Sequence, residues 1–273
     1  MKDHLNLCFP EWQGYAESNS VYYGALQMQQ IFSTTHEFVS IPVPAQEELP
    51  LKNDIIGYDA NLRQLKATAR VINQQKPTSI FMLGGTCATE IAPVSFLNHQ
   101  YDGNMTVLWL DAHGDLNTPQ SSPSKHFHGM PLRALLGESD PVVLQHAFST
   151  LSPNQVVLGG TRDLDQEEKR YIESNQVTIV TPANIHRVVD EVLDKQFAHI
   201  YIHIDLDVLD PQSFSHLLLP IPGGVLIDGL LKVLDELVRE IPLIGASIVE
   251  YVPDGTSGDA VLREIVAAMG LAQ

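Results

Sequence analysis

The chain alternates short apolar runs with longer amphipathic segments along most of its 273 residues, and this alternation restricts the fold more than any single motif. Most of the apolar runs are continuous stretches of Val, Ile and Leu, as in strands that are buried on both faces. Eight of them have the length of a strand: 5–9, 38–43, 79–83, 105–110, 155–158, 177–180, 198–204 and 243–249. Four other segments carry apolar residues at helical spacing: 55–73, 182–195, 225–239 and 258–271. The alternation predicts an α/β fold in which helices cover both faces of a parallel sheet.

The composition is that of a globular protein with a sizeable core. Hydrophobic residues make up 44% of the chain and charged residues 18%, which argues against disorder. No internal repeat, low-complexity tract or clear linker interrupts the sequence, so we expect a single domain over residues 1–273. The two cysteines, Cys8 and Cys87, are too few for a disulfide scaffold, and no run approaches the ~18 apolar residues of a membrane span. We therefore expect a cytoplasmic location.

The acidic charge restricts the partners of the protein. Sixteen Lys and Arg residues oppose 33 Asp and Glu residues, which gives a formal net charge of −17 at pH 7. Such a surface repels phosphate backbones and anionic lipids, so neither a nucleic acid nor a membrane is expected as a partner. A cationic small molecule would be attracted instead.

Possible metal ligands follow two of the predicted strands, where ligands of parallel α/β sheets bind. The run 105–110 is followed by Asp111-Ala112-His113-Gly114-Asp115, which places three residues of metal-ligand type within five positions. This motif alone is equally compatible with helix caps or a surface turn. A second motif at another strand end is needed to favour a metal.

The second motif lies at the end of the run 198–204, which contains His203 and continues to Asp205 and Asp207. Strand alternation would point these three side chains to one side. Two buried aspartates on one face repel each other, and a bound cation removes that repulsion. Carboxylates with a little imidazole suit Mn²⁺ or Mg²⁺ better than Zn²⁺, and two such ions would activate a water molecule near neutral pH.

These residues also carry a family resemblance. The stretches D-A-H-G-D-L-N-T-P at 111–119, H-G-M-P at 128–131 and H-I-D-L-D-V-L-D-P at 203–211 resemble those of the ureohydrolases, which comprise arginases, agmatinases and formiminoglutamases. The Gly84-Gly85 pair and Glu250 fit the same pattern. The resemblance implies a three-layer αβα sandwich around about eight mostly parallel strands, a centre of two Mn²⁺ ions and hydrolysis of guanidino or related groups. Members of this family often form trimers or hexamers.

The resemblance also implies a set of metal ligands. These are Asp111, His113, Asp115, Asp205 and Asp207, with Asp111 and Asp205 as the bridging carboxylates.

One expected ligand is replaced in this chain. The family has Gly-Gly-Asp-His at the glycine turn, whereas the sequence here reads Gly84-Gly85-Thr86-Cys87. Three consequences of Cys87 are compatible with the sequence. The first metal site is weakened or half-occupied, Cys87 binds the metal as a thiolate, or Cys87 is an inert small residue. A similar replacement occurs in an Nω-hydroxy-L-arginine amidinohydrolase, which the chain resembles around residues 115–119 and 202–209.

The resemblance assigns further residues to the substrate. His128 matches the proton-shuttle histidine of the family, and a histidine near neutral pKa suits proton delivery to a leaving amine. Asn117, Ser122 and Ser124 would bind the substrate's α-carboxylate.

The stretch 159–168 resembles the arginase segment for the α-ammonium group, so Asp165 would bind that group with help from Glu168. A charged helix N-terminus explains the same two residues equally simply.

Glu250 ends an apolar run and therefore needs a partner, for which a substrate guanidinium is suited. An internal salt bridge to Arg162 or Arg263 is the alternative. The family's Thr-Gly pair is absent here, because Leu217-Leu218-Leu219 stands in its place, and a more apolar wall favours a modified guanidino group.

Two histidines also depart from the pattern. His126 stands where arginases usually have asparagine, and His203 replaces a small residue. Each would either orient a ligand carboxylate or have no role at the site.

The sequence therefore predicts a manganese-dependent hydrolase of arginine or of a derivative such as Nω-hydroxy-L-arginine, giving ornithine and urea or hydroxyurea. His128, Glu250 and Asp115 are expected to take part in the reaction. One alternative is an agmatinase or formiminoglutamase, for which Arg133 is the candidate contact to an extra carboxylate. The other is a non-catalytic relative that binds metal or an amino acid.

Overall fold

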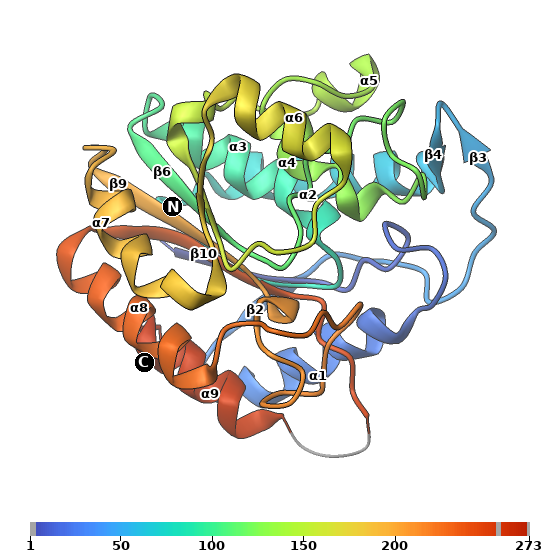
Figure 1. Cartoon of the computed structure of the whole chain (residues 1–273). Helices are drawn as coiled ribbons and strands as arrows, with labels where there is room; N and C mark the ends of the chain where they lie inside the picture. Colours follow the sequence, from blue (N-terminus) through green and yellow to red (C-terminus); the bar gives the residue numbers. More distant parts are fainter. Residues whose placement is uncertain (1–3, 255–257, 272–273) are drawn as a thin grey trace.

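The computed structural model describes residues 4–254 and 258–271. Its centre is a sheet of eight parallel strands in the order β2-β1-β5-β10-β9-β6-β7-β8 (Figure 1). The strands are β1 (His4–Phe9), β2 (Phe38–Ser40), β5 (Ser79–Gly84), β6 (Met105–Leu110), β7 (Val156–Gly159), β8 (Thr178–Val180), β9 (His199–Asp205) and β10 (Leu243–Val249). The predicted parallel sheet and all eight of its strands are confirmed.

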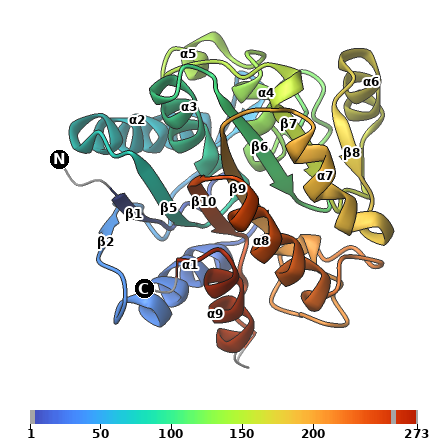
Figure 2. The ribbon, with the colours of Figure 1, turned by 90° about the vertical axis from the view of Figure 1, so that its left-hand side faces the viewer.

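Helices cover both faces of the sheet, as predicted for a three-layer sandwich (Figures 1 and 2). The upper layer in Figure 1 contains α2 (Tyr58–Gln75), α3 (Ile91–Gln100), α4 (Pro131–Leu135), α5 (Pro141–Leu144) and α6 (Gln166–Asn175). The lower layer contains α1 (Ser20–Phe32), α7 (Val188–Leu193), α8 (Ile227–Glu240) and α9 (Asp259–Ala268). No helix among the described residues is both long and apolar enough to cross a membrane.

Each face of the sheet buries its own apolar cluster. Along β5, Ile80 and Met82 pack into the cluster that includes residues of α2 and α3, whereas Phe81 and Leu83 pack into the cluster that includes residues of α1, α8 and α9. This alternation follows from the strand geometry, in which successive side chains point to opposite faces. Burial on both faces explains why the strands are apolar without a polar alternation.

Two of the predicted helices begin differently in the structure. Residues 55–56 form β4 (Ile55–Ile56), which pairs with β3 (Leu51–Lys52) in a small antiparallel sheet, and α2 starts only after Gly57, whose backbone is left-handed. Residues 182–187 form a kinked 3₁₀ turn before α7.

Two longer helices, α3 and α1, were not predicted from the sequence, and for a third, α6, only its N-terminus was offered as an alternative. In α3 eight of ten residues are buried, so the segment has no polar face to reveal a helical period. The helix α1 does carry the period, since Val21, Ala25, Met28 and Phe32 are buried at helical spacing, and it was therefore predictable. The helix α6 is mostly polar and shows itself in the sequence only through its capping residues.

Gly85 allows the ends of three strands to meet. The Gly85 backbone donates a hydrogen bond to the Phe9 carbonyl (2.9 Å) and accepts one from the Glu250 amide (2.8 Å), so it ties the ends of β1 and β10 to that of β5. A Cβ atom at this position would lie 1.7 Å from the backbone oxygen of Glu11. Only glycine therefore permits this close approach.

Replacing Gly85 by alanine should destabilise the fold by about 1–3 kcal/mol or more, because the clash is with backbone rather than with a flexible side chain. Gly229→Ala is the matched control: it lies within α8, and its added Cβ would make ordinary contacts of 3.6 Å. That control should gain about 0.5–1 kcal/mol. Urea denaturation of both variants measures the difference, and equal stabilities would contradict this interpretation.

Candidate metal centre and active site

The candidate site lies at the carboxyl edge of the four central strands, β5, β10, β9 and β6. Because these strands are neighbours and parallel, the segments that follow them converge. They deliver Cys87, Glu250, Asp205 and Asp111. All four of these residues are buried.

The segment after β6 begins at Asp111, whose carboxylate is fixed by its surroundings. Asp111 Oδ1 accepts a hydrogen bond from the His113 amide at 2.6 Å, and Oδ2 accepts one from Trp109 Nε1 at 3.1 Å. The ring of His113 turns toward Asp207, with Nδ1 at 2.9 Å from Oδ2.

The segment after β9 brings the second aspartate pair to the same place. The strand ends at Asp205, and Asp207 lies in a 3₁₀ turn rather than on the strand itself. Asp205 Oδ1 accepts from the Asp207 amide at 2.8 Å, and Asp207 Oδ1 accepts from the Ala112 amide at 2.9 Å. The two aspartate motifs are therefore joined across adjacent strands.

Two carboxylates of the site stand on left-handed backbone. Asp115 has φ of 52° and Glu250 has φ of 61°, a conformation that side-chain-bearing residues rarely adopt. Asp115 Oδ2 is also buried without a hydrogen-bond partner among the described residues. Strained backbone and an unsatisfied buried oxygen are both typical of functional sites.

The possible ligand atoms form three overlapping groups, each with its atoms within 4.8 Å of one another. The groups are Asp111, His113 and Asp207; Cys87, Asp205 and Glu250; and Cys87, Asp111, Asp115 and His203. All six of the sequence-predicted metal ligands belong to at least one group.

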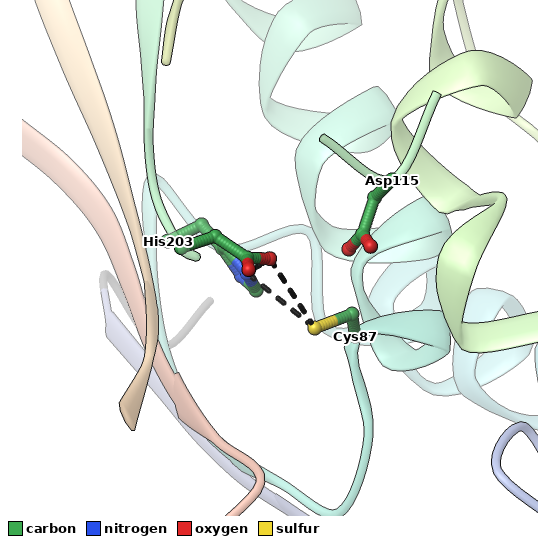
Figure 3. Close-up of side chains that lie close together, drawn as sticks. Cys87, Asp115 and His203 are labelled. Carbon is green, nitrogen blue, oxygen red and sulfur yellow. Dashed lines mark hydrogen bonds and ion pairs between the residues drawn. The ribbon is translucent and has the colours of Figure 1, made fainter. Parts of the chain in front are cut away.

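Cys87 points into the centre of the cluster. It opens the 3₁₀ turn η1 (Cys87–Glu90) after β5, and its Sγ lies 3.0 Å from Asp205 Oδ2 and 3.7 Å from His203 Nε2. Figure 3 shows Cys87, Asp115 and His203 directed toward one another. Burial and then the nearby carboxylates raise the pKa of the thiol well above its usual value, so without a cation it stays protonated.

Crowding of negative charge perturbs the carboxylates. Burial, followed by neighbouring acids, raises the pKa of Asp115 and of Asp205 well above the ordinary aspartate value. Burial and the charge of Asp111 raise the pKa of Asp207 to about 6. For Asp111, burial also acts to raise the pKa, but hydrogen bonds to His113 and His203 outweigh it and the pKa is lowered. Cations are the natural means of keeping all four carboxylates ionised together.

A cavity of about 150 Å³ opens above this cluster. Its lining includes the following sequence-predicted residues: Cys87, His113, Asp115, Asn117, Ser122, Ser124, His128, Asp165, Glu168, Asp205 and Glu250. Asp111 and Asp207 lie beneath them and are completely buried. Leu219 adds an apolar patch to the wall, whereas Leu217 and Leu218 pack into apolar clusters.

Asp165 and Glu168 have a structural role as well as a place in the cavity wall. They form the capping box of α6, so the helix N-terminus interpretation is correct. Both oxygens of Glu168 accept backbone hydrogen bonds, from Leu116 and Asp165, and burial raises its pKa to about 7. Asp165 Oδ2 accepts from Asn117 Nδ2 at 2.8 Å, which joins the two proposed substrate contacts.

His128 and Glu250 form a pair at the cavity wall. His128 Nδ1 lies 2.8 Å from Glu250 Oε1. Burial acts to lower the pKa of His128, but the charge and hydrogen bond of Glu250 outweigh it and the pKa is raised. The alternative salt bridge of Glu250 is wrong, because the guanidinium groups of Arg162 and Arg263 donate to backbone carbonyls instead.

Several neighbours of the site were not predicted as such. Glu11, which follows β1, is buried and accepts hydrogen bonds from the Thr86 hydroxyl and the Gly14 amide. Burial raises its pKa to about 7. The strand-end rule that found Asp111 would have found Glu11 too. By contrast, His126 lies beside Tyr15, at a ring-centroid distance of 5.6 Å, and belongs to none of the three ligand groups.

The sequence and the fold of this chain are similar to those of known proteins. Residues 14–270 match the arginase family. The arginase of Staphylococcus aureus (strain COL) is 31% identical over 203 residues, which cover 68% of this chain and 66% of the relative. The arginase of Bacillus caldovelox is 28% identical over 270 residues, which cover 91% of this chain and 88% of the relative.

The solved structure of Entamoeba histolytica arginase in complex with L-ornithine has the same fold. It superposes with a TM-score of 0.88 over 99% of each chain, at 20% identity. The sequence matches and the shared fold together show that this chain belongs to the arginase family.

Proposed function

We propose that this chain hydrolyses the guanidino group of arginine or an arginine derivative, with divalent metal ions, preferably Mn²⁺, at the cluster described above. The observation that carries the proposal is the convergence of four buried aspartates and an imidazole on the floor of a cavity. Membership of the arginase family supports hydrolysis of an amidine C–N bond.

The donor atoms fit metal ions. Asp111, His113 and Asp207 would hold one ion, and Cys87, Asp111 and Asp115 would contribute to a second, with Asp205 close to Cys87. Such ions would coordinate Asp115 Oδ2, which has no hydrogen-bond partner among the described residues. They would also offset the repulsion among the aspartates. When bound, metal ions at such a centre supply a nucleophilic water at neutral pH.

The remaining steps belong to the side chains of the cavity. Glu250 would accept the guanidinium bidentately and orient its carbon. As the water oxygen forms a bond to that carbon, Asp115 would accept a proton from the water; the bond from carbon to the alkyl nitrogen then breaks, and His128 donates a proton to the departing nitrogen. The products are an ornithine-like amine and urea, or hydroxyurea from a hydroxylated substrate.

The far wall of the cavity supports an amino-acid substrate rather than a simple amine. Asn117, Ser122 and Ser124 offer neutral donors for a carboxylate, and Asp165 offers an acceptor for an ammonium group. Leu219 adds apolar surface to the wall, and Nω-hydroxyarginine is the arginine derivative that we include among the proposed substrates.

The position of Arg133 disfavours formiminoglutamate. Its guanidinium lies over the Tyr171 ring at 3.6 Å and donates to the Leu116 carbonyl and to Glu138. It lines a neighbouring hollow instead of the cavity above Cys87. An extra substrate carboxylate would therefore lack the cation that this alternative requires.

A substrate panel tests the proposal. With Mn²⁺ present, arginine or Nω-hydroxyarginine should give ornithine, whereas agmatine and formiminoglutamate should react poorly. Asp165→Asn should raise KM more than it lowers kcat, and Glu167→Gln, a half-exposed change in the first turn of α6, is the control. Turnover of agmatine alone would overturn the amino-acid assignment, and no turnover of any substrate would favour a non-catalytic relative.

His128→Asn should lower kcat by about 10²–10⁴, as expected for loss of a general acid. The neighbouring variant His126→Asn should leave kcat within about twofold, since His126 packs on Tyr15 and belongs to none of the ligand groups. Steady-state assays on the preferred substrate compare the two. Similar losses in both variants would remove His128 from the mechanism.

Metal should stabilise the fold. A free metal concentration of about 100 times Kd adds about 2.7 kcal/mol to the free energy of unfolding. This corresponds to a rise in Tm of about 5–10 °C for a chain of this length. Differential scanning calorimetry with Mn²⁺ and with a chelator measures this rise. Asp111→Asn should reduce it strongly, while Asp235→Asn, a half-exposed change on α8, should keep it. An unchanged Tm in wild-type protein would argue against a metal centre.

A further inference from the structure

The replacement of the family histidine by Cys87 leaves the metal centre one imidazole short. A second imidazole lies within reach on a different strand. His203 stands on β9, in register with Trp109 of β6 and Ser247 of β10, and is completely buried. Its Nε2 atom is 3.7 Å from Cys87 Sγ and 3.8 Å from Asp111 Oδ2.

We propose that His203 Nε2 is a direct ligand of the metal ion shared by Cys87, Asp111 and Asp115, and so replaces the imidazole that the glycine turn has lost. This inference rests on the metal centre of the proposed function and assigns to it a residue outside the expected ligand set. The position is one where the family resemblance implies a small side chain.

The geometry of the four ligand atoms supports direct ligation. They lie within 4.8 Å of one another, and two ligand atoms at typical bond lengths from one ion are about 3–4 Å apart. The separation of His203 Nε2 and Cys87 Sγ falls in this range. Asp115 contributes the buried Oδ2 that has no hydrogen-bond partner in the described part of the chain.

The other face of the imidazole is held as a ligand histidine requires. His203 Nδ1 lies 3.1 Å from Glu90 Oε1, and Glu90 Oε2 accepts a hydrogen bond of 2.7 Å from the Tyr201 hydroxyl. A carboxylate at Nδ1 favours the tautomer that leaves the Nε2 lone pair free for a metal. Glu90 and Cys87 belong to the same 3₁₀ turn, so one turn supplies both a ligand and the group that orients its neighbour.

The ring itself is immobilised. The Trp109 indole stacks on His203 with a centroid distance of 3.7 Å and an interplanar angle of 23°, and its Nε1 donates to Asp111 Oδ2. Trp109 therefore positions two ligands at once. A donor set of one sulfur, one nitrogen and carboxylate oxygens is softer than one of imidazole and oxygens, so this ion site should favour Co²⁺ over Mn²⁺ more strongly than the other site does.

Titration with Co²⁺ tests the assignment independently of activity. The full chain, stripped of metal, is titrated and followed by calorimetry and by the near-ultraviolet thiolate-to-cobalt band. Wild type should bind two equivalents. His203→Gln keeps a polar group facing Glu90, and should lower the affinity of one equivalent by more than about tenfold, since losing a group that only orients a ligand already costs about 10–100-fold. The near-ultraviolet thiolate-to-cobalt band should change as the affinity of this equivalent falls.

Two further variants keep the test decisive. Cys87→His in the His203→Gln background restores an imidazole from the glycine turn and should recover the second equivalent. His36→Gln, a change of a buried histidine outside the site, should bind as wild type does. The Tm of each metal-free variant shows whether the fold is retained.

The outcomes separate the two proposals. If wild type binds two equivalents and His203→Gln binds them with unchanged affinities and spectrum, His203 is a structural residue and this inference fails alone. If wild type binds no metal at all, the proposed function and this inference fail together. Loss of one equivalent in His203→Gln with recovery in the double variant supports the ligand role.

Discussion

Mutual repulsion among buried carboxylates is the constraint on which the rest of the site depends. Asp111, Asp115, Asp205 and Asp207 are buried in and beneath the wall of one cavity, and burial together with neighbouring negative charge raises the pKa of three of them. A protein that only needed stability would have filled this space with apolar side chains. The arrangement is retained at the cost of backbone strain at Asp115, and the divalent cations that we propose would offset the repulsion.

The sheet makes this concentration of charge possible. Its four central strands are parallel, so their polar ends meet at one edge while their apolar bodies fill both layers of the core. The hydrogen bonds of Gly85 to Phe9 and Glu250 tie the ends of β1 and β10 to that of β5. The candidate ligands therefore lie at the ends of rigid elements, and the loops around Asn117 and Ser122 add polar side chains to the cavity wall.

Local patterns in the sequence were sufficient for the sheet and for the two aspartate motifs, because each is a property of a few consecutive residues. They were insufficient for contacts between distant segments. The bond from Glu90 to His203 spans 113 positions, and nothing near either residue indicates it. The pairing of Glu250 with His128 instead of an arginine is of the same kind. Asp165 shows a further difficulty, because helix capping and a place in the cavity require the same residue type there.

The strand order has a consequence for how the centre is assembled during synthesis. β6 and β9 are neighbours, so Asp111, His113 and Asp207 can meet as soon as β9 has left the ribosome. β10 is the last strand of the sheet in the chain and lies between β5 and β9. The side of the centre that includes Cys87 is therefore completed only after β10 has been synthesised and has closed the middle of the sheet.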